Sequence, residues 1–376
     1  MAQVTLTHVS KVSADGCDCK GRISGGDAVQ DFSLEVRDRE FVVLAGPPGC
    51  GNSTVLRLVA GLDAVGGGEI TIGNRPVTAL SPKDRDVAMV FAHYALYPHL
   101  SGYANIAFGL KGRRFPKAEV DKRVRQAAEM TGIDALERKP QALTPLEQLR
   151  VALARAIVRQ PKVLLLDDPL AALEPAARAG MRAELVKLQE RLQTTFLYAT
   201  QDPVEVLTLA HRAALMQAGA LRQFDAPLAL YQKPANRFAA EFLGQPPMNL
   251  LAGRLRAAQD GVLFKETDGT VEVKFADGPE LKALAGKEVL LGIRPEDVQP
   301  VAPTEVKTRG VRCQGIIDHV EATGSDVYYY VQTGAHTVVL RGGPGGEPGG
   351  AGRRMQFDID PQKVHLFDAE TNARIL

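Results

Sequence analysis

The chain has 376 residues, of which 45% are hydrophobic and 24% are charged, with 45 Lys and Arg against 44 Asp and Glu. This length exceeds the usual size of one hydrophobic core and favours two domains, and the composition excludes a largely disordered chain. A net charge of +1 gives no electrostatic reason to expect nucleic acid as a partner.

The N-terminal residues contain no apolar core of signal-peptide length, and no stretch of the sequence approaches the apolar run needed to span a bilayer. We therefore expect a cytoplasmic protein, or one peripheral to a membrane. Cys17 and Cys19 form a Cys-Asp-Cys sequence that could bind a soft metal, but no second Cys/His pair has ligand spacing. Reduced thiols are the simpler interpretation of four cysteines in a chain of this length.

Apolar runs typical of buried strands begin near Phe41, Lys162 and Thr194, and they alternate with stretches of helical periodicity. This α/β alternation predicts a parallel sheet with helices packed on both faces. From about Gln245 onward, short strand candidates separated by Gly- and Pro-containing turns predict an all-β region. We expect domains at 1–243 and 244–376.

The run from Arg341 to Arg354 is rich in glycine and lacks apolar anchors, which predicts a loop. Its arginines could contact phosphate, but a solvated loop is the simpler interpretation.

A stretch between the strand at Phe41 and a helical segment has the G-x-x-x-x-G-x-S spacing of a Walker A loop, in the strand-loop-helix setting that this motif requires. Gly49 and Gly51 allow successive N–H groups and the following helix N-terminus to face a polyphosphate, and Ser53 can ligate Mg²⁺. The predicted nucleotide-binding residues are Gly46, Pro47, Pro48, Gly49, Cys50, Gly51, Asn52, Ser53 and Thr54.

Further motifs make the whole chain similar to the ATP-binding subunits of ABC importers for sugars, polyols and glycerol phosphate. The landmarks are VFAHYALYPHLS from Val90, QLRVALARAIVRQPKVLLLDDPL ending at Leu170, YATQDPVEVLTLAHR from Tyr198, LYQKPANRFAAEFLGQPPMN from Leu230 and LGIRPEDV from Leu291.

The resemblance implies a P-loop (RecA-like) ABC nucleotide-binding domain with a helical subdomain at roughly 90–160, followed by an all-β OB-like regulatory domain of the TOBE/MOP type. It also implies ATP and Mg²⁺ as cofactors, with Ser53 and Asp167 as metal ligands. The implied partners are transmembrane permease subunits, which the chain would meet at the inner face of the cell membrane. A second copy of the chain or a related ATPase subunit is the other implied partner. In a homodimer, the C-terminal β-domain and the helices before it would hold the two copies together.

Several positions depart from the family pattern. Asn52 stands where the family has the Walker A lysine, so a charge-assisted hydrogen bond to phosphate of roughly 1.5 to 3 kcal/mol is lost. Asp168 replaces the glutamate that acts as general base and is one methylene shorter. Gln201 replaces the switch histidine, and Ala92 replaces the glutamine that senses Mg²⁺ and water. Glutamine orients the attacking water in some GTPases, so Gln201 alone need not abolish activity.

The signature loop differs most, because the family's LSGGQ is replaced by Leu143-Thr-Pro-Leu-Glu147. Pro145 has no N–H, Leu146 adds bulk, and Glu147 places negative charge near an anion. Ser13 stands at or near the place of the aromatic residue that stacks on adenine, and Glu174 replaces an aspartate of the D-loop. No pairing of subunits yields a complete family-type site.

Three functions are compatible with this pattern. The first is a pseudo-ATPase that docks on or regulates a sugar-type importer, since Tyr94 to Ser101 retains the stretch beside the permease docking groove; the same stretch could also be ordinary packing. The second is a slow but functional transport ATPase. The third is a free-standing module whose β-domain senses a small molecule or a regulator protein.

Overall fold

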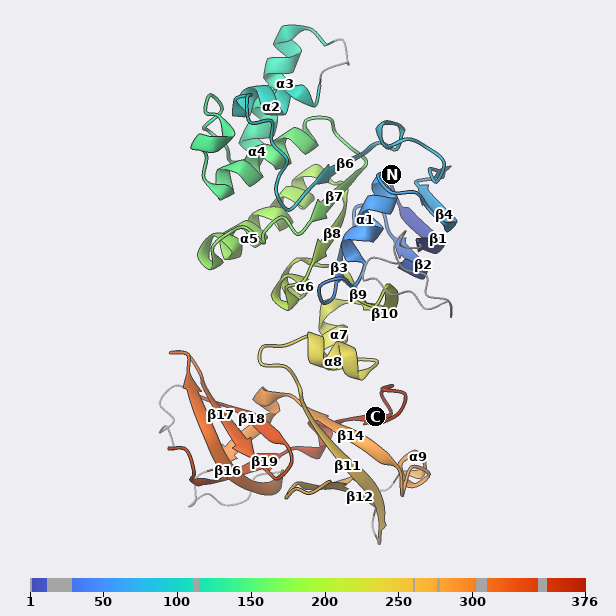
Figure 1. The fold of residues 1–376 in the computed structure, drawn as a ribbon, viewed down its shortest axis with the longest axis vertical. Helices are drawn as coiled ribbons and strands as arrows, with labels where there is room; N and C mark the ends of the chain where they lie inside the picture. The colour runs from blue at the N-terminus through green and yellow to red at the C-terminus, as the bar shows by residue number, and fades with distance from the viewer. Residues whose placement is uncertain are drawn as a thin grey trace, which may run out of the picture. The chain divides into compact units, whose positions relative to one another are not determined.

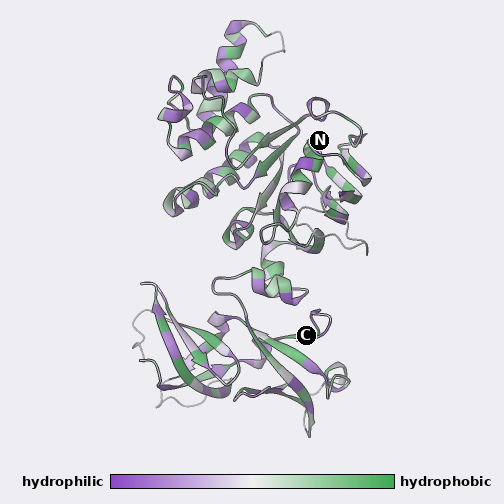
Figure 2. Cartoon of the chain, in the orientation of Figure 1, coloured by the Kyte–Doolittle hydropathy of each residue, from purple (hydrophilic) through white to green (hydrophobic). Residues whose placement is uncertain are grey.

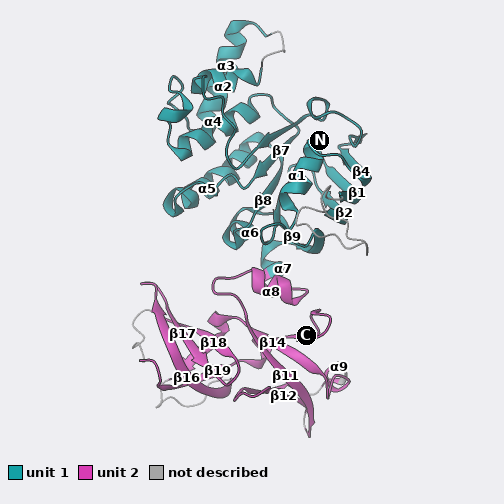
Figure 3. Cartoon of the chain, in the orientation of Figure 1, with its two compact units in different colours: residues 1–230 teal, residues 231–376 magenta. Residues whose placement is uncertain are grey.

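The computed structural model describes residues 2–11, 29–110, 115–259, 261–275, 278–301, 310–343 and 350–376. Contacts within the chain divide it into two compact units, Met1–Leu230 and Tyr231–Leu376 (Figure 3). The domain boundary expected between residues 243 and 244 and the helical subdomain expected at roughly 90–160 stay predictions. Ser13, Cys17 and Cys19 lie outside the described residues.

The central sheet of unit 1 has the strand order β10-β9-β3-β8-β7-β6 (Figure 1). All neighbouring strands in it are parallel except β9 and β10. Every residue of β3 and β8 is buried, as expected where both faces of a parallel sheet are covered. The predicted parallel sheet is confirmed, with strands β3 (Phe41–Ala45), β6 (Val87–Val90), β7 (Val163–Asp167), β8 (Thr195–Thr200), β9 (Arg212–Gln217) and β10 (Ala220–Asp225).

A second, antiparallel sheet of order β2-β1-β4-β5 shares one core with the central sheet and with helix α1 (Asn52–Ala60). Leu6 of the antiparallel sheet, Leu44 of the central sheet and Val55 of α1 all lie in that core. The predicted helices on both faces are confirmed, with α1 on this face, but the antiparallel sheet that also covers it was not predicted. The alternation of buried Val4 and Leu6 with more exposed neighbours is the signal of its first strand. The strands are β1 (Val4–Lys11), β2 (Val29–Val36), β4 (Gly67–Ile72) and β5 (Arg75–Pro76).

Helix α6 (Pro203–Leu209) packs against β3 and β8 and contacts α5 (Pro175–Leu192). Since side chains along a strand alternate between the two faces, Leu197 and Ala199 of β8 enter the shared core while Tyr198 faces α6. Three further helices pack on one another at one end of unit 1 (Figure 1). These are α2 (Gly102–Phe108), α3 (Lys117–Thr131) and α4 (Pro145–Ile157).

Unit 2 consists mainly of two five-stranded antiparallel sheets that share one core, and Phe264 and Phe357 are fully buried in it. Buried and exposed residues alternate from Cys313 to Asp318 of β16. Figure 2 shows hydrophilic and hydrophobic residues interspersed along the strands of unit 2. The predicted all-β region is confirmed apart from the short helix α9 (Pro279–Lys282) and two 3-10 turns, Pro295–Asp297 and Pro361–Lys363. The first sheet contains β11 (Asn249–Ala258), β12 (Gly261–Glu266), β13 (Glu272–Phe275), β14 (Glu288–Ile293) and β20 (His365–Asp368). The second contains β15 (Val298–Val301), β16 (Val311–Ala322), β17 (Val327–Gln332), β18 (Thr337–Gly342) and β19 (Arg354–Ile359).

Two short helices lie around the division between the units, α7 (Pro227–Gln232) and α8 (Arg237–Phe242). The glycine-rich run predicted as a loop from Arg341 to Arg354 starts within β18 and ends within β19, so the prediction is wrong at both ends. Arg341 pairs with Tyr328 in the β17–β18 ladder, and its guanidinium binds Asp326 at 2.7 Å. Residues 344–349 lie outside the described residues.

Candidate functional site

The predicted phosphate loop joins the end of β3 to the start of α1. Gly49 and Gly51 have φ angles of 75° and 98°, in the left-handed region that strains residues with a side chain. A Cβ atom at Gly46 would lie 2.1 Å from the carbonyl oxygen of Met216, so only glycine fits there. The strand-loop-helix setting that the Walker A spacing requires is present.

The predicted nucleotide-binding residues differ in where they face. Pro47–Gly49 are exposed, whereas Cys50 and Thr54 are buried. The Cys50 N–H donates to the Pro47 carbonyl at 3.1 Å, and the Cys50 carbonyl accepts from the Gly219 N–H at 3.0 Å. Burial raises the pKa of the Cys50 thiol. Cys50 therefore anchors the loop on the core instead of offering its side chain to a ligand.

Asn52 uses both ends of its side-chain amide within the chain. Its Nδ2 donates to the Thr200 carbonyl at 3.0 Å, and its Oδ1 accepts from the Ser53 N–H at 2.8 Å. That N–H belongs to the first turn of α1, where backbone donors have no partner inside the helix. Asn52 thus occupies the Ser53 N–H, a donor that a phosphate would need, and it supplies no positive charge. At this position the residues fit a triphosphate poorly.

Ser53 and Asp167 are the two predicted metal ligands, and the fold brings them together. Ser53 Oγ donates to Asp167 Oδ1 at 2.6 Å, joining the start of α1 to the end of β7. A hydroxyl and a carboxylate oxygen are ligand types that Mg²⁺ prefers. This pair is the part of the site that fits the implied metal. Among the residues that the structure describes, no group of three or more His, Cys, Asp or Glu side chains is arranged to hold a metal.

Asp168 follows β7 with a φ angle of 44°, a strained value for a residue with a side chain. Its N–H donates to the Ala199 carbonyl at 2.9 Å, which holds it at the edge of the central sheet. Burial, together with the neighbouring Asp167 carboxylate, raises the pKa of Asp168, and Arg178 opposes this shift. A raised pKa favours proton acceptance. The shorter side chain, rather than its acidity, therefore remains the predicted defect at the general-base position.

Within the described part of the chain, the structure gives neither of the two predicted sensor residues, Gln201 and Ala92, a hydrogen bond that would position its side chain toward a ligand. Gln201 is exposed, and its side chain forms no hydrogen bond to any described residue. Ala92 is half-buried and has no polar side-chain atom. Their roles stay predictions.

Sequence reasoning missed a buried acid beneath this edge of the sheet. Glu205 of α6 is 1% exposed, and its Oε2 accepts from Thr200 Oγ1 at 2.6 Å and from the Tyr198 hydroxyl at 2.8 Å. Since Thr200 is also the residue whose carbonyl holds Asn52, Glu205 positions the end of β8 against the phosphate loop. A single glutamate on a helix gives no sequence signal for this role.

The predicted signature loop forms the start of α4, with Thr144 as the N-cap. The Glu147 N–H donates to Thr144 Oγ1 at 3.3 Å, and the Thr144 N–H donates to Glu147 Oε2 at 2.8 Å. The hydrogen bond from the Thr144 backbone lowers the pKa of Glu147. The chain's own carboxylate therefore occupies the electropositive helix start that an anion would use. The spacing Thr144-x-x-Glu147 is a capping-box signature that our reading of the sequence overlooked.

Replacing the N-cap should destabilise this helix start. We expect Thr144→Ala to lower the free energy of unfolding by about 1 kcal/mol, because the Glu147 N–H loses its side-chain partner. Glu147→Gln should have a smaller effect, since glutamine at this position also closes a capping box. Urea denaturation followed by circular dichroism measures both variants. Equal unfolding energies for wild type and Thr144→Ala would contradict the capping role.

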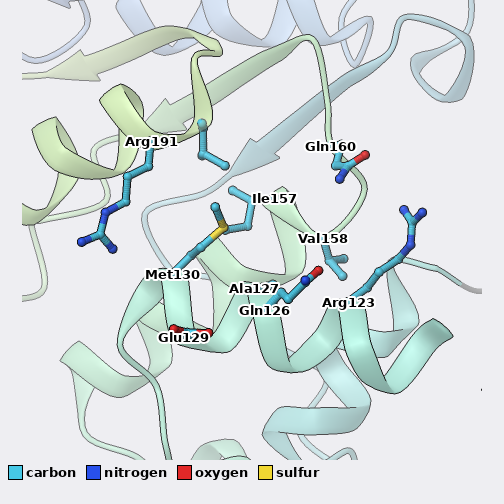
Figure 4. A pocket seen from close by; sticks show the side chains of 10 residues that line it. Arg123, Gln126, Ala127, Glu129, Met130, Ile157, Val158, Gln160 and Arg191 are labelled. Atoms are coloured by element: carbon cyan, nitrogen blue, oxygen red, sulfur yellow. The ribbon is translucent and has the colours of Figure 1, made fainter. Parts of the chain in front are cut away.

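Two hollows lined by described residues of unit 1 lie away from the phosphate loop. One, of about 430 Å³, lies between α3, the end of α4 and the end of α5 (Figure 4). Its middle is apolar, with Met130 and Ile157, and Arg123 and Arg191 lie on opposite sides. The other, of about 620 Å³, is lined by Phe91, Tyr97, Phe108, Arg155 and residues near them. Neither contains a residue predicted to bind nucleotide.

Comparison with known proteins assigns families to three segments. Residues 29–171 match the ABC transporter family, residues 244–298 the MalK OB fold domain and residues 291–367 the TOBE domain. The described residues include no helix long and apolar enough to cross a membrane.

The chain is similar to curated proteins along its whole length. It is 41% identical to the sn-glycerol-3-phosphate import ATP-binding protein UgpC of Rhodopseudomonas palustris (strain BisB18), over 100% of both chains. It is 42% identical to the oligosaccharides import ATP-binding protein MsmX of Bacillus subtilis (strain 168), over 93% of this chain and 95% of that protein.

Solved structures match about three fifths of the chain. A dimeric post-hydrolysis state of the ATP-binding cassette MJ0796 bound to ADP and Pi has a TM-score of 0.52 and 26% identity, over 60% of this chain and 98% of that one. CbiO1 from Clostridium perfringens, part of the ABC transporter complex CbiONQ, has a TM-score of 0.55 and 25% identity, over 61% of this chain and 90% of that one.

Proposed function

Because this chain belongs to the family of ATP-binding subunits of sugar-type ABC importers, we propose that it is a pseudo-ATPase subunit of such an importer, with weak ATP binding and little or no hydrolysis. It docks on membrane permease subunits at the inner face of the cell membrane and pairs with a second copy or with a related ATPase subunit. The import role named for UgpC and MsmX supports the permease partners, and the dimeric MJ0796 cassette supports the pairing.

The observation that carries this proposal is that side chains of the protein itself occupy two helix starts predicted to bind phosphate. At α1, Asn52 Oδ1 accepts the Ser53 N–H. At α4, Glu147 accepts the Thr144 N–H, and Pro145 has no N–H to offer. A phosphate at α1 would have to displace an existing hydrogen bond without gaining a lysine. A phosphate at α4 would meet a carboxylate of the same sign of charge.

The 620 Å³ hollow supports the docking part of the proposal. Arg155 of α4 donates to the carbonyls of Tyr94 and Ala95 at 2.8 and 2.7 Å, and both of these residues have positive φ angles. Tyr94 is 3% exposed, so its own ring serves packing, and its hydroxyl donates to the Pro169 carbonyl at 3.1 Å. The Tyr94–Ala95 segment at the wall of the hollow is therefore hydrogen-bonded to Pro169, the residue after Asp168. A permease helix docked in this hollow would contact a segment that is hydrogen-bonded to the residue beside the general-base position.

We expect purified protein to bind Mg-ATP and Mg-ADP weakly, so that either nucleotide raises the melting temperature only slightly. The glycines of the loop and the Ser53–Asp167 pair are retained, but the charge of the missing lysine is not replaced. Thermal unfolding with and without nucleotide, and calorimetric titration, test this. A dissociation constant below micromolar for Mg-ATP would overturn it. Co-purification with the permease subunits tests docking separately.

The Ser53–Asp167 contact at 2.6 Å favours a second candidate function, a slow transport ATPase that energises sugar or polyol uptake, because it preserves the metal-binding half of the site. Steady phosphate release by the wild-type chain, abolished by Ser53→Ala, would establish that function. A free-standing regulatory module is the third candidate. It would neither co-purify with permease subunits nor release phosphate.

A further inference from the structure

Unit 2 has a hollow of its own, of about 490 Å³, where the second sheet meets the turn between β12 and β13. Its polar lining comes from Thr270, Gln314, Gln332, Thr333 and Arg354, and Ile316 supplies the large apolar side chain. Ile316 is 51% exposed and presents its apolar side chain at the outer face of the sheet. The strand register places Gln332 and Arg354 directly beside it on the neighbouring strands, one on each side.

Three polar side chains of this hollow have hydrogen-bonding capacity to spare. The amides of Gln314 and Gln332 and the guanidinium of Arg354 form no hydrogen bond or ion pair to any described residue. Amides can donate and accept at the same time, whereas a guanidinium only donates. The Thr270 hydroxyl donates to the Gln314 carbonyl at 2.6 Å, which leaves it as an acceptor for a ligand. Such a set matches the hydroxyl groups of a sugar or polyol, each of which is both donor and acceptor. The Ile316 side chain offers an apolar wall for C–H groups.

The charges around the hollow favour a neutral ligand over a highly charged anion. Glu266 lies behind the lining with a fully buried side chain, and its Oε1 accepts from Thr333 Oγ1 at 2.7 Å. His336 Nδ1 lies 2.9 Å from Glu266 Oε1. On the other side of the ring, the Ala252 N–H donates to His336 Nε2 at 3.2 Å. The negative charge of Glu266 opposes the positive charge of Arg354, so the hollow offers a dianion no net attraction.

The shape of the hollow depends on two residues without side chains. A Cβ at Gly334 would lie 1.9 Å from the Asp268 carbonyl oxygen, and a Cβ at Gly315 would lie 2.5 Å from Val331 Cγ1. Gly334 also has a φ angle of 152°, which favours glycine. These glycines allow the β12–β13 turn to approach the second sheet and to form one side of the hollow.

We propose that this hollow is a binding site for a neutral polyhydroxylated small molecule, a sugar or a polyol, in the β-domain. Gln314, Gln332 and Arg354 bind the hydroxyl groups, and Ile316 packs against the C–H face. The inference stands on unit 2 alone and does not depend on nucleotide chemistry or on permease docking.

Saturation-transfer NMR and calorimetric titration of the full chain test the proposal, with maltose, glucose and glycerol as probes and inorganic phosphate as the anionic comparison. We expect at least one neutral probe to bind and phosphate to bind more weakly. Gln332→Ala and Arg354→Ala should each weaken binding by about three- to tenfold, as expected for the loss of one hydrogen bond. Gln299→Ala is the matched control, because Gln299 is an exposed glutamine of β15 outside the hollow.

Three outcomes would overturn the proposal. The first is that none of the neutral probes binds. The second is that Gln299→Ala weakens binding as much as Gln332→Ala does. The third is that phosphate binds more tightly than every neutral probe. Since neither ATP nor permease is present in these titrations, their failure would leave the proposed pseudo-ATPase function untouched, and failure of that function would leave these titrations unaffected.

Discussion

Asn52→Lys alone is expected to strengthen nucleotide binding by about ten- to a hundredfold without producing steady ATP hydrolysis. The lysine supplies the missing charge, and it releases the Ser53 N–H that Asn52 Oδ1 now accepts. Hydrolysis stays absent because Asp168, Ala92 and Gln201 are unchanged. Calorimetric titration measures the binding, and a coupled phosphate-release assay measures the turnover. Robust phosphate release from this single variant would show that the other positions matter less than we infer.

Family-like hydrolysis should require repair of the phosphate-binding, general-base, sensor and signature positions together. Adding Asp168→Glu and Gln201→His remains insufficient in a homodimer, because the start of α4 still presents the Thr144–Glu147 capping box and Pro145. Loss of oriented donors at a developing charge costs roughly 3 to 4 kcal/mol each. Only a variant that also carries Ala92→Gln and the changes Thr144→Ser, Pro145→Gly, Leu146→Gly and Glu147→Gln should release phosphate steadily. The matched control is the same variant with Asn52 retained, which we expect to bind ATP weakly.

Arg294→Ala is expected to lower the unfolding free energy of unit 2 by about 3 to 5 kcal/mol. Arg294 is 2% exposed, and its guanidinium donates to the backbone carbonyls of Tyr231, Ala240 and Leu243. It also lies 3.8 Å from the centre of the Tyr231 ring. Alanine would leave these carbonyls without their charged partner and would release α8 from the start of the β-domain.

A matched control for this prediction is Arg254→Ala in the same unit. Arg254 pairs with Glu288 at 2.7 Å, but both side chains are more than half exposed. Such surface pairs contribute less than about 1 kcal/mol. Because the chain has no tryptophan, differential scanning calorimetry and hydrogen exchange of the full chain are suitable measurements. Similar losses for the two variants would contradict the clamping role of Arg294.

The sequence by itself predicted the features that depend on short stretches of chain. The spacing from Gly46 to Ser53 indicated a loop of exposed N–H groups between a strand and a helix, since glycine tolerance of positive φ is a local property. It also showed that Pro145 has no donor and that Asn52 has no charge, because both follow from residue chemistry alone. The order of a nucleotide-binding domain and a β-domain followed from apolar periodicity and from family landmarks.

Only the tertiary structure decided which partners the polar side chains around the phosphate loop have. Asn52 donates to Thr200, and Ser53 donates to Asp167, across separations of 148 and 114 residues. No local pattern encodes such contacts, because they arise where parallel strands end at a common edge of the sheet. The same holds for the burial of Glu205, for the clamp at Arg294 and for the hollow beside Ile316. In each of these, the partner groups come from segments that are distant in the chain and meet only when the sheets and helices pack.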